Sequence, residues 1–230
     1  LTRELVKADR YTITHDAWIA LSGALAGEPG VIAIAGTGSI VFGRNREGRG
    51  ARAGGWGYIF GDEGGAFDIV RKALRAVLRH EEGWGPPTAL RDLLLDASGA
   101  KTANDLLHRF YTGEHTRERV AAMAPLADRA AALGDATAQD ILKGAAQSIA
   151  NLVAAARDQL FAPEETAIVS YTGGVFRSRA LFERFRMLVE LDANRIAPPV
   201  HGPAAGALIE AYRAAGATCV LKDVPNEKGA

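Results

Sequence analysis

The chain has little cysteine, no excess of either charge and no long apolar run, and each absence excludes a class of protein. Cys219 is the one cysteine, so neither a disulfide framework nor a multi-cysteine metal or iron–sulfur site can form within one chain. A reducing cytoplasm is the expected compartment. The 27 Lys and Arg residues balance the 27 Asp and Glu residues, which argues against a basic nucleic-acid surface and against an acidic, disordered chain. No apolar run reaches about 18 residues, so we expect no membrane span. The first residues also show no signal-peptide pattern.

Glycine is plentiful but unevenly distributed. The chain has 230 residues, of which 48% are hydrophobic, enough to bury a core. Of its 26 glycines, 11 lie between Gly36 and Gly65, whereas the longer segment from Ala66 to Leu133 contains four. Glycine allows backbone conformations and close approaches that other residues resist. The segment 36–65 is therefore predicted to contain tight turns or backbone that contacts a ligand.

The apolar pattern predicts an α/β fold with a mixed sheet. Apolar runs bounded by turn residues predict strands, and apolar residues at helical spacing predict helices. The expected strands are 11–15, 31–35, 40–44, 50–54, 166–171 and 194–196. The expected helices lie at about 17–26, 66–81, 88–96, 103–111, 115–133, 136–160, 179–190 and 204–215. The helices between about 66 and 160 are expected to form an insertion that carries the dimer-forming surface of any homodimer.

The string Gly36-Thr37-Gly38-Ser39 follows a strand that is predicted to be covered on both faces. Its glycines let backbone N–H groups converge, and its hydroxyls add donors, so it can cradle a phosphate. It is neither a Walker A loop nor a dinucleotide fingerprint, because no Gly-Lys-Ser/Thr follows and a strand comes next. A plain β-hairpin turn is the alternative interpretation.

Two further glycine-rich strings surround an aromatic and two carboxylates. Gly54–Gly57 places Trp56 between glycines, where its face can stack on a sugar or a base. Asp62 and Glu63 follow within Gly61–Gly65, just before a predicted helix, so capping of that helix is the alternative role for either carboxylate.

Two other features lie at the ends of predicted strands. Gly173 and Gly174 follow the strand 166–171, where the turn either passes under a flat ring such as adenine or simply joins a strand to a helix. Asp16 also follows a predicted strand, and carboxyl ends of strands are where α/β folds place their chemistry. A helix N-cap is the alternative role for Asp16.

Taken in order, these strings resemble the N-acetylglucosamine kinase-like branch of the BadF/BadG/BcrA/BcrD ATPase family, within the superfamily of sugar kinases, actin and heat-shock chaperones. The similarity extends over about residues 11–215. The strings that carry it are Asp16-Ala17, Val31 to Ser39, Gly54 to Gly57, Gly61 to Gly64, Thr172 to Val175 and Pro203 to Ala207.

The resemblance implies a ribonuclease H-like, actin-like ATPase fold with two lobes, which bind ATP, Mg²⁺ and an amino sugar between them. It implies phosphorylation of N-acetylglucosamine or glucosamine to the 6-phosphate, with Asp16 as the base that accepts the proton of the sugar hydroxyl. The implied ATP contacts are Gly36, Thr37, Gly38, Ser39, Gly173 and Gly174. The implied sugar contacts are Asp16, Ser39, Gly55, Trp56, Gly57 and Asp62.

Family members open with a phosphate-binding string similar to Asp-Gly-Gly-Gly-Thr, which this sequence does not contain. We therefore expect residues 1–28 to be a remnant of the N-terminal lobe, 29–218 the C-terminal lobe and 219–230 a tail. A chain of this kind is expected to lack kinase turnover by itself. Two alternatives are an ATPase subunit that activates a redox enzyme and a non-catalytic sugar-binding module. Neither nucleic acid nor a membrane is an expected partner.

Overall fold

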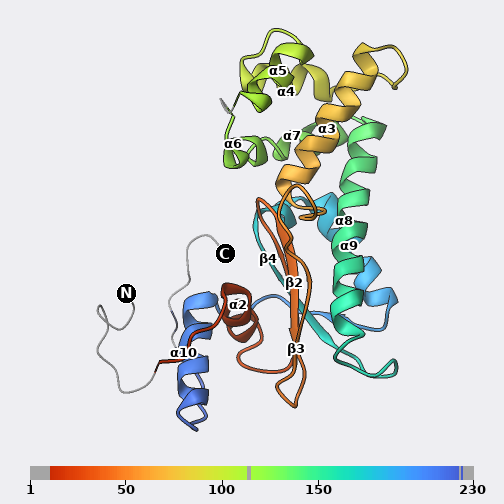
Figure 1. Ribbon diagram of the computed structural model, residues 1–230. Helices are drawn as coiled ribbons and strands as arrows, with labels where there is room; N and C mark the ends of the chain where they lie inside the picture. Colours follow the sequence, from red (N-terminus) through yellow and green to blue (C-terminus); the bar gives the residue numbers. More distant parts are fainter. Residues whose placement is uncertain (1–10, 113–114, 223, 225–230) are drawn as a thin grey trace.

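A computed structural model describes residues 11–112, 115–222 and 224 of the chain, which are built around a five-stranded mixed sheet (Figure 1). The strand order is β3-β2-β1-β4-β5. The strands are β1 (Gly30–Ala35), β2 (Ser39–Arg44), β3 (Gly50–Gly54), β4 (Ile168–Thr172) and β5 (Arg195–Ile196). The first three pair in antiparallel fashion, whereas β4 runs parallel to both β1 and β5. The predicted mixed sheet is confirmed.

Strand β1 lies in the middle of the sheet because its side chains are apolar on both faces. Successive residues of a strand point to opposite faces. Val31 and Ala33 accordingly belong to the larger core cluster, and Ile32 belongs to the smaller one. The two clusters lie on opposite faces of the sheet.

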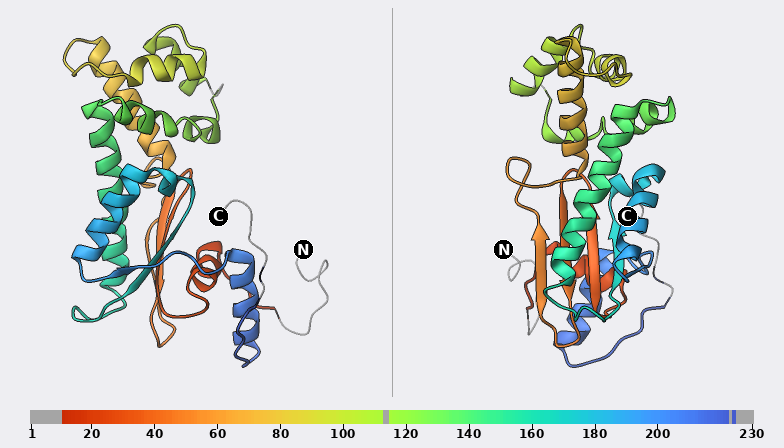
Figure 2. Two further views of the ribbon diagram at one scale, coloured as in Figure 1. Left: turned by 180° about the vertical axis from the view of Figure 1, so that it is seen from behind. Right: turned by 90° about the vertical axis from the view of Figure 1, so that its right-hand side faces the viewer.

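Helices cover both faces of the sheet (Figures 1 and 2). The larger cluster includes side chains of α8 (Ala136–Arg157) and α9 (Arg179–Leu191). The smaller cluster includes side chains of α2 (Asp16–Ala24), which packs closely against α10 (Pro203–Ala214). The sheet and its two helical layers form the α/β lobe of the molecule.

Helices α2 and α10 approach so closely that glycine is required on both. A Cβ atom on Gly206 would lie 1.8 Å from the carbonyl oxygen of Ile19, and one on Gly23 would lie 2.2 Å from that of Gly202. Beside this contact, Arg44 of β2 donates to Glu210 of α10 at 2.8 Å. Two helices that are distant in sequence are thereby joined to each other and to the sheet.

Five helices between β3 and α8 form an insertion beyond one end of the sheet, at the top of Figure 1. They are α3 (Ala66–Glu81), α4 (Leu90–Ser98), α5 (Ala103–Tyr111), α6 (Arg117–Ala121) and α7 (Pro125–Ala132). The helical stretch predicted at 115–133 is therefore two helices. They are separated at 122–124, where Pro125 begins α7, since proline is favoured in the first turn of a helix.

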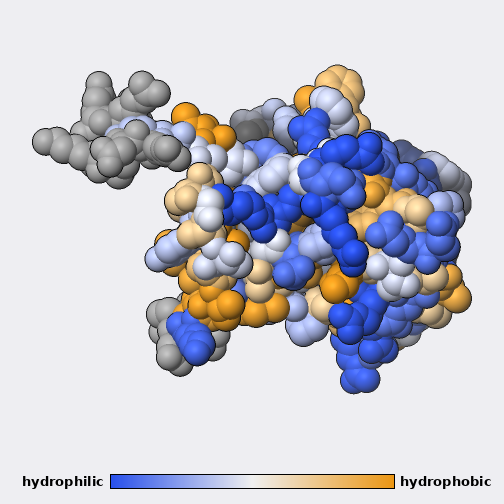
Figure 3. Space-filling view, turned by 90° about the horizontal axis from the view of Figure 1, so that it is seen from below, coloured by the Kyte–Doolittle hydropathy of each residue, from blue (hydrophilic) through white to orange (hydrophobic). Residues whose placement is uncertain are grey.

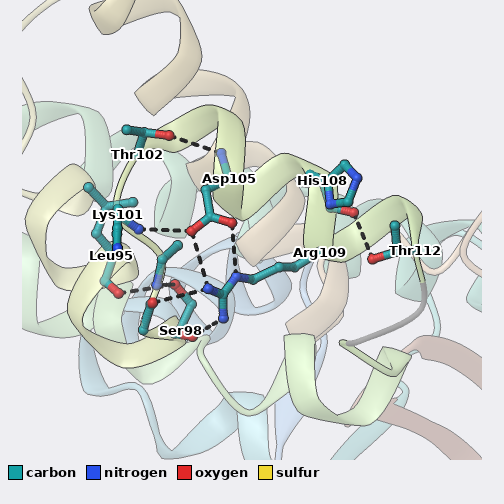
Figure 4. A network of polar contacts seen from close by, with 10 residues as sticks. Leu95, Ser98, Lys101, Thr102, Asp105, His108, Arg109 and Thr112 are labelled. Carbon is teal, nitrogen blue, oxygen red and sulfur yellow. Dashed lines mark hydrogen bonds and ion pairs between the residues drawn. The ribbon is translucent and has the colours of Figure 1, made fainter.

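A network of polar contacts orders the turn between α4 and α5 (Figure 4). Thr102 caps α5 by accepting from the N–H of Asp105 at 3.0 Å. The Asp105 carboxylate accepts from the N–H of Lys101 and from Arg109, and Arg109 also donates to the carbonyl of Ser98. Arg109 and Lys101 therefore hold the pKa of Asp105 below its ordinary value.

The prediction of a strand at residues 11–15 is wrong. In the described part of the chain these residues form no strand, and they lead into α2 with His15 as its N-cap. A strand needs a neighbour to pair its backbone groups, and the sheet ends at β3 and β5. Residues 1–10 of the predicted N-terminal segment, and 223 and 225–230 of the predicted tail, lie outside the described residues.

Seen from below, the surface mixes hydrophilic and hydrophobic residues (Figure 3). On α10, Leu208 and Tyr212 are partly exposed. Among the described residues, no helix combines the length and the apolar character that a membrane crossing requires.

Candidate active site

The glycine-rich strings come together at one end of the sheet, where they form the turns after β1, β3 and β4. The N–H of Gly55 donates to the carbonyl of Ser39 at 3.1 Å, which joins the turn after β3 to the turn after β1. A Cβ on Gly65 would lie 2.7 Å from the carbonyl carbon of Gly38. A Cβ on Gly173 would lie 2.3 Å from the carbonyl oxygen of Ala35. Strings far apart in sequence thus form one surface.

The glycines of this surface fall into two kinds. Gly38 and Gly173 are required by packing, because a side chain on either would clash with a neighbour that is already in place. Gly36 and Gly174 face open space, with nothing within 4 Å of a Cβ atom, and both line a cleft. Packing therefore explains why Gly38 and Gly173 are glycines, but it does not explain Gly36 and Gly174. The backbone of these two remains open to a ligand.

The cleft has a volume of about 1450 Å³ and lies between the helical insertion and the α/β lobe. Helices α6 and α7 form one wall, and α8, α9 and the short 3₁₀ turn η1 (Gly174–Arg177) form the other. Its charged lining residues are Glu118, Asp128, Lys143, Arg177, Arg179, Glu183 and Arg184. Sequence reasoning missed all seven, because they come from four helices and the 3₁₀ turn, which meet only in the folded chain.

A hydrogen bond between two side chains connects α7 to the start of α9 across this cleft. The hydroxyl of Ser178 donates to the Asp128 carboxylate of α7. Ser178 is also the N-cap of α9, as the sequence predicts, and accepts from the N–H of Leu181 at 3.3 Å. The start of α9 is therefore tied to the insertion across the cleft.

The turn after β1 is anchored by the start of α3 and by the loop before it. The N–H groups of Ala66 and Phe67, in the first turn of α3, donate to the carbonyls of Gly36 and Thr37 at 2.9 and 3.1 Å. The Ser39 hydroxyl donates to the carbonyl of Glu63 at 2.7 Å, so the proton of this hydroxyl is already engaged in a hydrogen bond within the protein. Gly36 and Thr37 are the members of the turn that line the cleft.

Asp62 lies directly beside this turn. It is 5% exposed, and its backbone has a φ of 60°, a left-handed conformation that is uncommon outside glycine. Its Oδ2 accepts from the Nη2 of Arg117 at 2.5 Å. A Cβ on Gly38 would lie 2.3 Å from the same oxygen. The carboxylate is thus held against the turn by a residue that the sequence pattern did not reveal.

Neither Asp62 nor Glu63 caps α3, so that alternative is wrong. The N-cap is Gly65, and the carboxylate of Asp68 accepts from the N–H of Gly64 at 3.0 Å. Burial raises the pKa of Asp68, but the Gly64 N–H together with Lys72 and Arg71 outweighs it, so the pKa lies below its ordinary value. The buried Asp68 carboxylate therefore holds the loop before α3 in place by accepting from its backbone.

Trp56 lies outside the cleft lining and is 68% exposed. The Arg52 guanidinium lies 4.4 Å from the centre of the indole ring, a cation–π contact. A Cβ on Gly61 would lie 3.1 Å from the Cβ of Trp56, so the loop folds back against the tryptophan. The indole is therefore held in place at the surface close to Asp62.

Asp16 occupies the first turn of α2, where it is exposed and accepts from the N–H of Ala17 at 2.8 Å. His15 packs on Phe42 of β2, whereas Ser22, near the other end of α2, lies by Arg44. Since β2 runs from Ser39 to Arg44, the N-terminal end of α2 points toward the glycine turns. Asp16 is not part of the cleft lining, so the cleft does not bring it together with Gly36 and Gly174.

A metal ion would have to rely on few protein ligands here. Within residues 11–112, 115–222 and 224, no three His, Cys, Asp or Glu side chains are placed to hold an ion together. Mg²⁺ in nucleotide sites is bound largely by phosphate oxygens and water, with one or two carboxylates. Such a site would be compatible with this set of residues.

The sheet order, the helices on both faces and the turn-lined cleft define a ribonuclease H-like fold of the actin-like ATPase type. Residues 2–211 match the BadF/BadG/BcrA/BcrD ATPase family, and the chain belongs to that family.

Two characterised relatives share more than a third of their aligned residues with the chain. An N-acetylmuramic acid/N-acetylglucosamine kinase of Clostridium acetobutylicum is 34% identical over 85% of this chain and 64% of its own length. An N-acetyl-D-glucosamine kinase of Dictyostelium discoideum is 36% identical over 76% of this chain and 56% of its own length. The chain therefore spans less than two thirds of either relative.

A solved structure that is similar to this chain carries the same kind of kinase assignment as these relatives. A Chromobacterium violaceum protein assigned as an N-acetylglucosamine kinase has a TM-score of 0.70 and 29% identity, over 85% of this chain and 64% of its own.

Proposed function

We propose that this chain carries the nucleotide-binding lobe of a kinase that transfers a phosphoryl group from ATP to an amino sugar, N-acetylglucosamine or glucosamine, to give the 6-phosphate. The observation that carries the proposal is the cleft of about 1450 Å³, which reaches the open glycines Gly36 and Gly174 a short distance from Asp62. The names of both characterised relatives support it. We further propose that the protein is cytoplasmic and that any homodimer forms through the insertion.

The cleft supplies what phosphoryl transfer needs from a protein, namely placed phosphates and neutralised charge. In the proposal, the turn Gly36 to Ser39 holds the phosphates, and Gly173 and Gly174 lie by the adenosine. Packing fixes Gly38 and Gly173, and Gly36 and Gly174 present their backbone to the nucleotide. Mg²⁺ bound to the phosphates would neutralise their charge.

The sugar is proposed to lie on the surface formed by the second and third glycine strings. Gly55, Trp56, Gly57 and Asp62 would contact it, with the Asp62 carboxylate accepting from a hydroxyl and the indole supplying an apolar face. Asp16 would accept the proton of the attacking hydroxyl. General acid–base catalysis of this kind contributes a factor of about 10² to 10⁴.

Sugar-stimulated release of ADP tests the proposal. The natural full-length protein is assayed with ATP and a panel of N-acetylglucosamine, glucosamine, N-acetylmuramic acid and glucose. ADP release above background with an amino sugar, and a product identified as the 6-phosphate, are the expected results. Equal ADP release with and without every sugar would defeat the proposal.

Substitution of the proposed base gives a second test. Asp16→Asn is expected to lower kcat by about 10² or more while leaving ATP binding unchanged. Unchanged turnover would remove Asp16 from this role.

A further inference from the structure

Arg117 makes a contact that neither the sequence strings nor the nucleotide cleft explain. Its Nη2 lies 2.5 Å from Oδ2 of Asp62, whose side chain is 8% exposed, whereas the arginine side chain is 35% exposed. Among the described residues, Oδ1 of Asp62 has no hydrogen-bond partner. The carboxylate is thus fixed through one oxygen and keeps the other for a ligand.

The arginine itself is held in place. It is the first residue of α6, which is capped by Thr116. Its guanidinium lies 5.5 Å from the centre of the Tyr58 ring, and that ring packs edge-on against Phe67 at 5.1 Å. A planar guanidinium with this support has little freedom to turn, so it defines the orientation of the carboxylate that it binds.

The ion pair lies between two sites. Glu118, the next residue of α6, lines the nucleotide cleft, whereas Arg117 does not and contacts Asp62 instead. A Cβ on Gly38 would lie 2.7 Å from Nη2 of Arg117, so the pair also touches the turn after β1. Helix α6 therefore presents adjacent residues to the nucleotide and to the sugar surface.

Stability alone is a weak explanation for this pair. Solvent around the arginine, which is a third exposed, screens the pair and limits what it adds to the free energy of unfolding. By contrast, orienting a carboxylate that is itself buried in an uncommon backbone conformation has a direct consequence for what that carboxylate can bind.

We propose that Arg117 is a positioning residue for the sugar, which holds Asp62 so that its free oxygen Oδ1 accepts from a sugar hydroxyl. The inference rests on the proposed function, and in particular on Asp62 as a sugar contact. It makes the helical insertion part of the sugar site, because α6 would determine sugar affinity without contacting the sugar.

The test separates sugar binding from nucleotide binding in the natural full-length protein. Arg117→Met keeps the length of the side chain but removes its donors, and Arg117→Lys keeps the charge. Arg119→Met, an exposed arginine of the same helix, is the matched control. KM for the amino sugar, KM for ATP, kcat and the thermal unfolding midpoint are measured for each.

For Arg117→Met we expect a rise of about tenfold in KM for the sugar, the scale of one charge-assisted hydrogen bond, with less than a twofold change in KM for ATP. Arg117→Lys should recover part of the loss, and Arg119→Met should behave as the wild type. In a cycle with Asp62→Asn, the double variant should be no worse than Asp62→Asn alone, because the arginine acts through that carboxylate.

Three results would overturn the inference: a sugar KM that is unchanged in Arg117→Met, equal increases in both KM values, or additive losses in the cycle. If Arg117→Met does not fold, Arg117→Gln replaces it with the same expectations. Wild-type protein that shows no sugar-stimulated ADP release would defeat the proposed function, and the inference with it. Active wild type with an unaffected variant would defeat the inference alone.

Discussion

At the scale of single residues, the two glycines after β4 are adjacent but carry different constraints. Gly173 has a φ of 110°, and a Cβ there would lie 2.3 Å from the Ala35 carbonyl oxygen, whereas Gly174 faces the cleft with nothing within 4 Å. Gly173→Ala should therefore destabilise the protein by about 2 kcal/mol, the scale of strained backbone. Gly174→Ala should leave the unfolding midpoint unchanged but weaken ATP binding, because its methyl group enters the cleft.

Thermal unfolding and titration with a fluorescent ATP analogue distinguish the two effects. An increase of about fivefold in Kd corresponds to about 1 kcal/mol and would support the role of Gly174. ATP binding that is equal to wild type in Gly174→Ala would show that the nucleotide does not contact this residue.

At the scale of elements, a hydrogen bond from Ser178 at the start of α9 to Asp128 of α7 connects the two walls of the cleft. Asp128→Ala should loosen that contact and weaken nucleotide binding by about tenfold, since one hydrogen bond to a charged group is lost and the wall becomes free to move. Asp96→Ala, an exposed carboxylate of α4, is the control for loss of charge from the insertion. Equal Kd values for the two variants would contradict a role for this bond.

The contact between α2 and α10 gives a second prediction at this scale. In Gly206→Ala the new methyl group would overlap the Ile19 carbonyl oxygen at 1.8 Å, so the helices must separate. We expect a loss of about 3 kcal/mol in the free energy of unfolding, as in overpacked cores. Gly144→Ala is the matched control, because that helical glycine of α8 has open space around it.

Alanine at position 144 should stabilise by about 0.5 to 1 kcal/mol through helix propensity. Urea denaturation of both variants provides the comparison. Similar effects at the two positions would show that the contact between α2 and α10 is not the cause.

The sequence predicted the elements better than their contacts. Five strands were predictable because β1 and its neighbours are apolar and bounded by turns, and the glycine strings indicated the end of the sheet that the cleft reaches. The strand at 11–15 failed because local β propensity cannot show whether a partner strand exists. Arg117 and Asp128 could not be found, because each acquires its partner only when the insertion folds against segments that are distant in sequence.

At the scale of the whole molecule, two carboxylates with lowered pKa values fix separate parts of the fold. Asp68 anchors the loop before the insertion. Glu210 of α10 accepts from Arg44, Arg213 and Ser22, and so joins α10 to α2 and the sheet. Burial raises the pKa of Glu210, but hydrogen bonds from Ser22 and Arg44 outweigh it and bring the pKa below its ordinary value of 4.5.

The sign of the pH dependence follows from this shift. A carboxylate whose pKa is lower in the folded state stabilises the fold fully above its ordinary value, and the effect disappears as the pH falls through the folded pKa. Glu210→Gln should therefore be less stable than the wild type by about 2 kcal/mol at pH 7, because a charge-assisted bond becomes neutral and Arg44 remains buried. Below pH 4.5 the wild type should lose stability more steeply than the variant, and the difference between them should shrink.

Urea denaturation at a series of pH values between 7 and 3, followed by tryptophan fluorescence, measures both curves. Glu183→Gln is the control, because that glutamate is exposed on α9 and pairs with a single exposed arginine, Arg179. Its curve should run close to that of the wild type, since exposed pairs contribute little. If the Glu210→Gln and wild-type curves were parallel at all pH values, the acid sensitivity of the fold would have to arise from other carboxylates, with Asp68 the next to test.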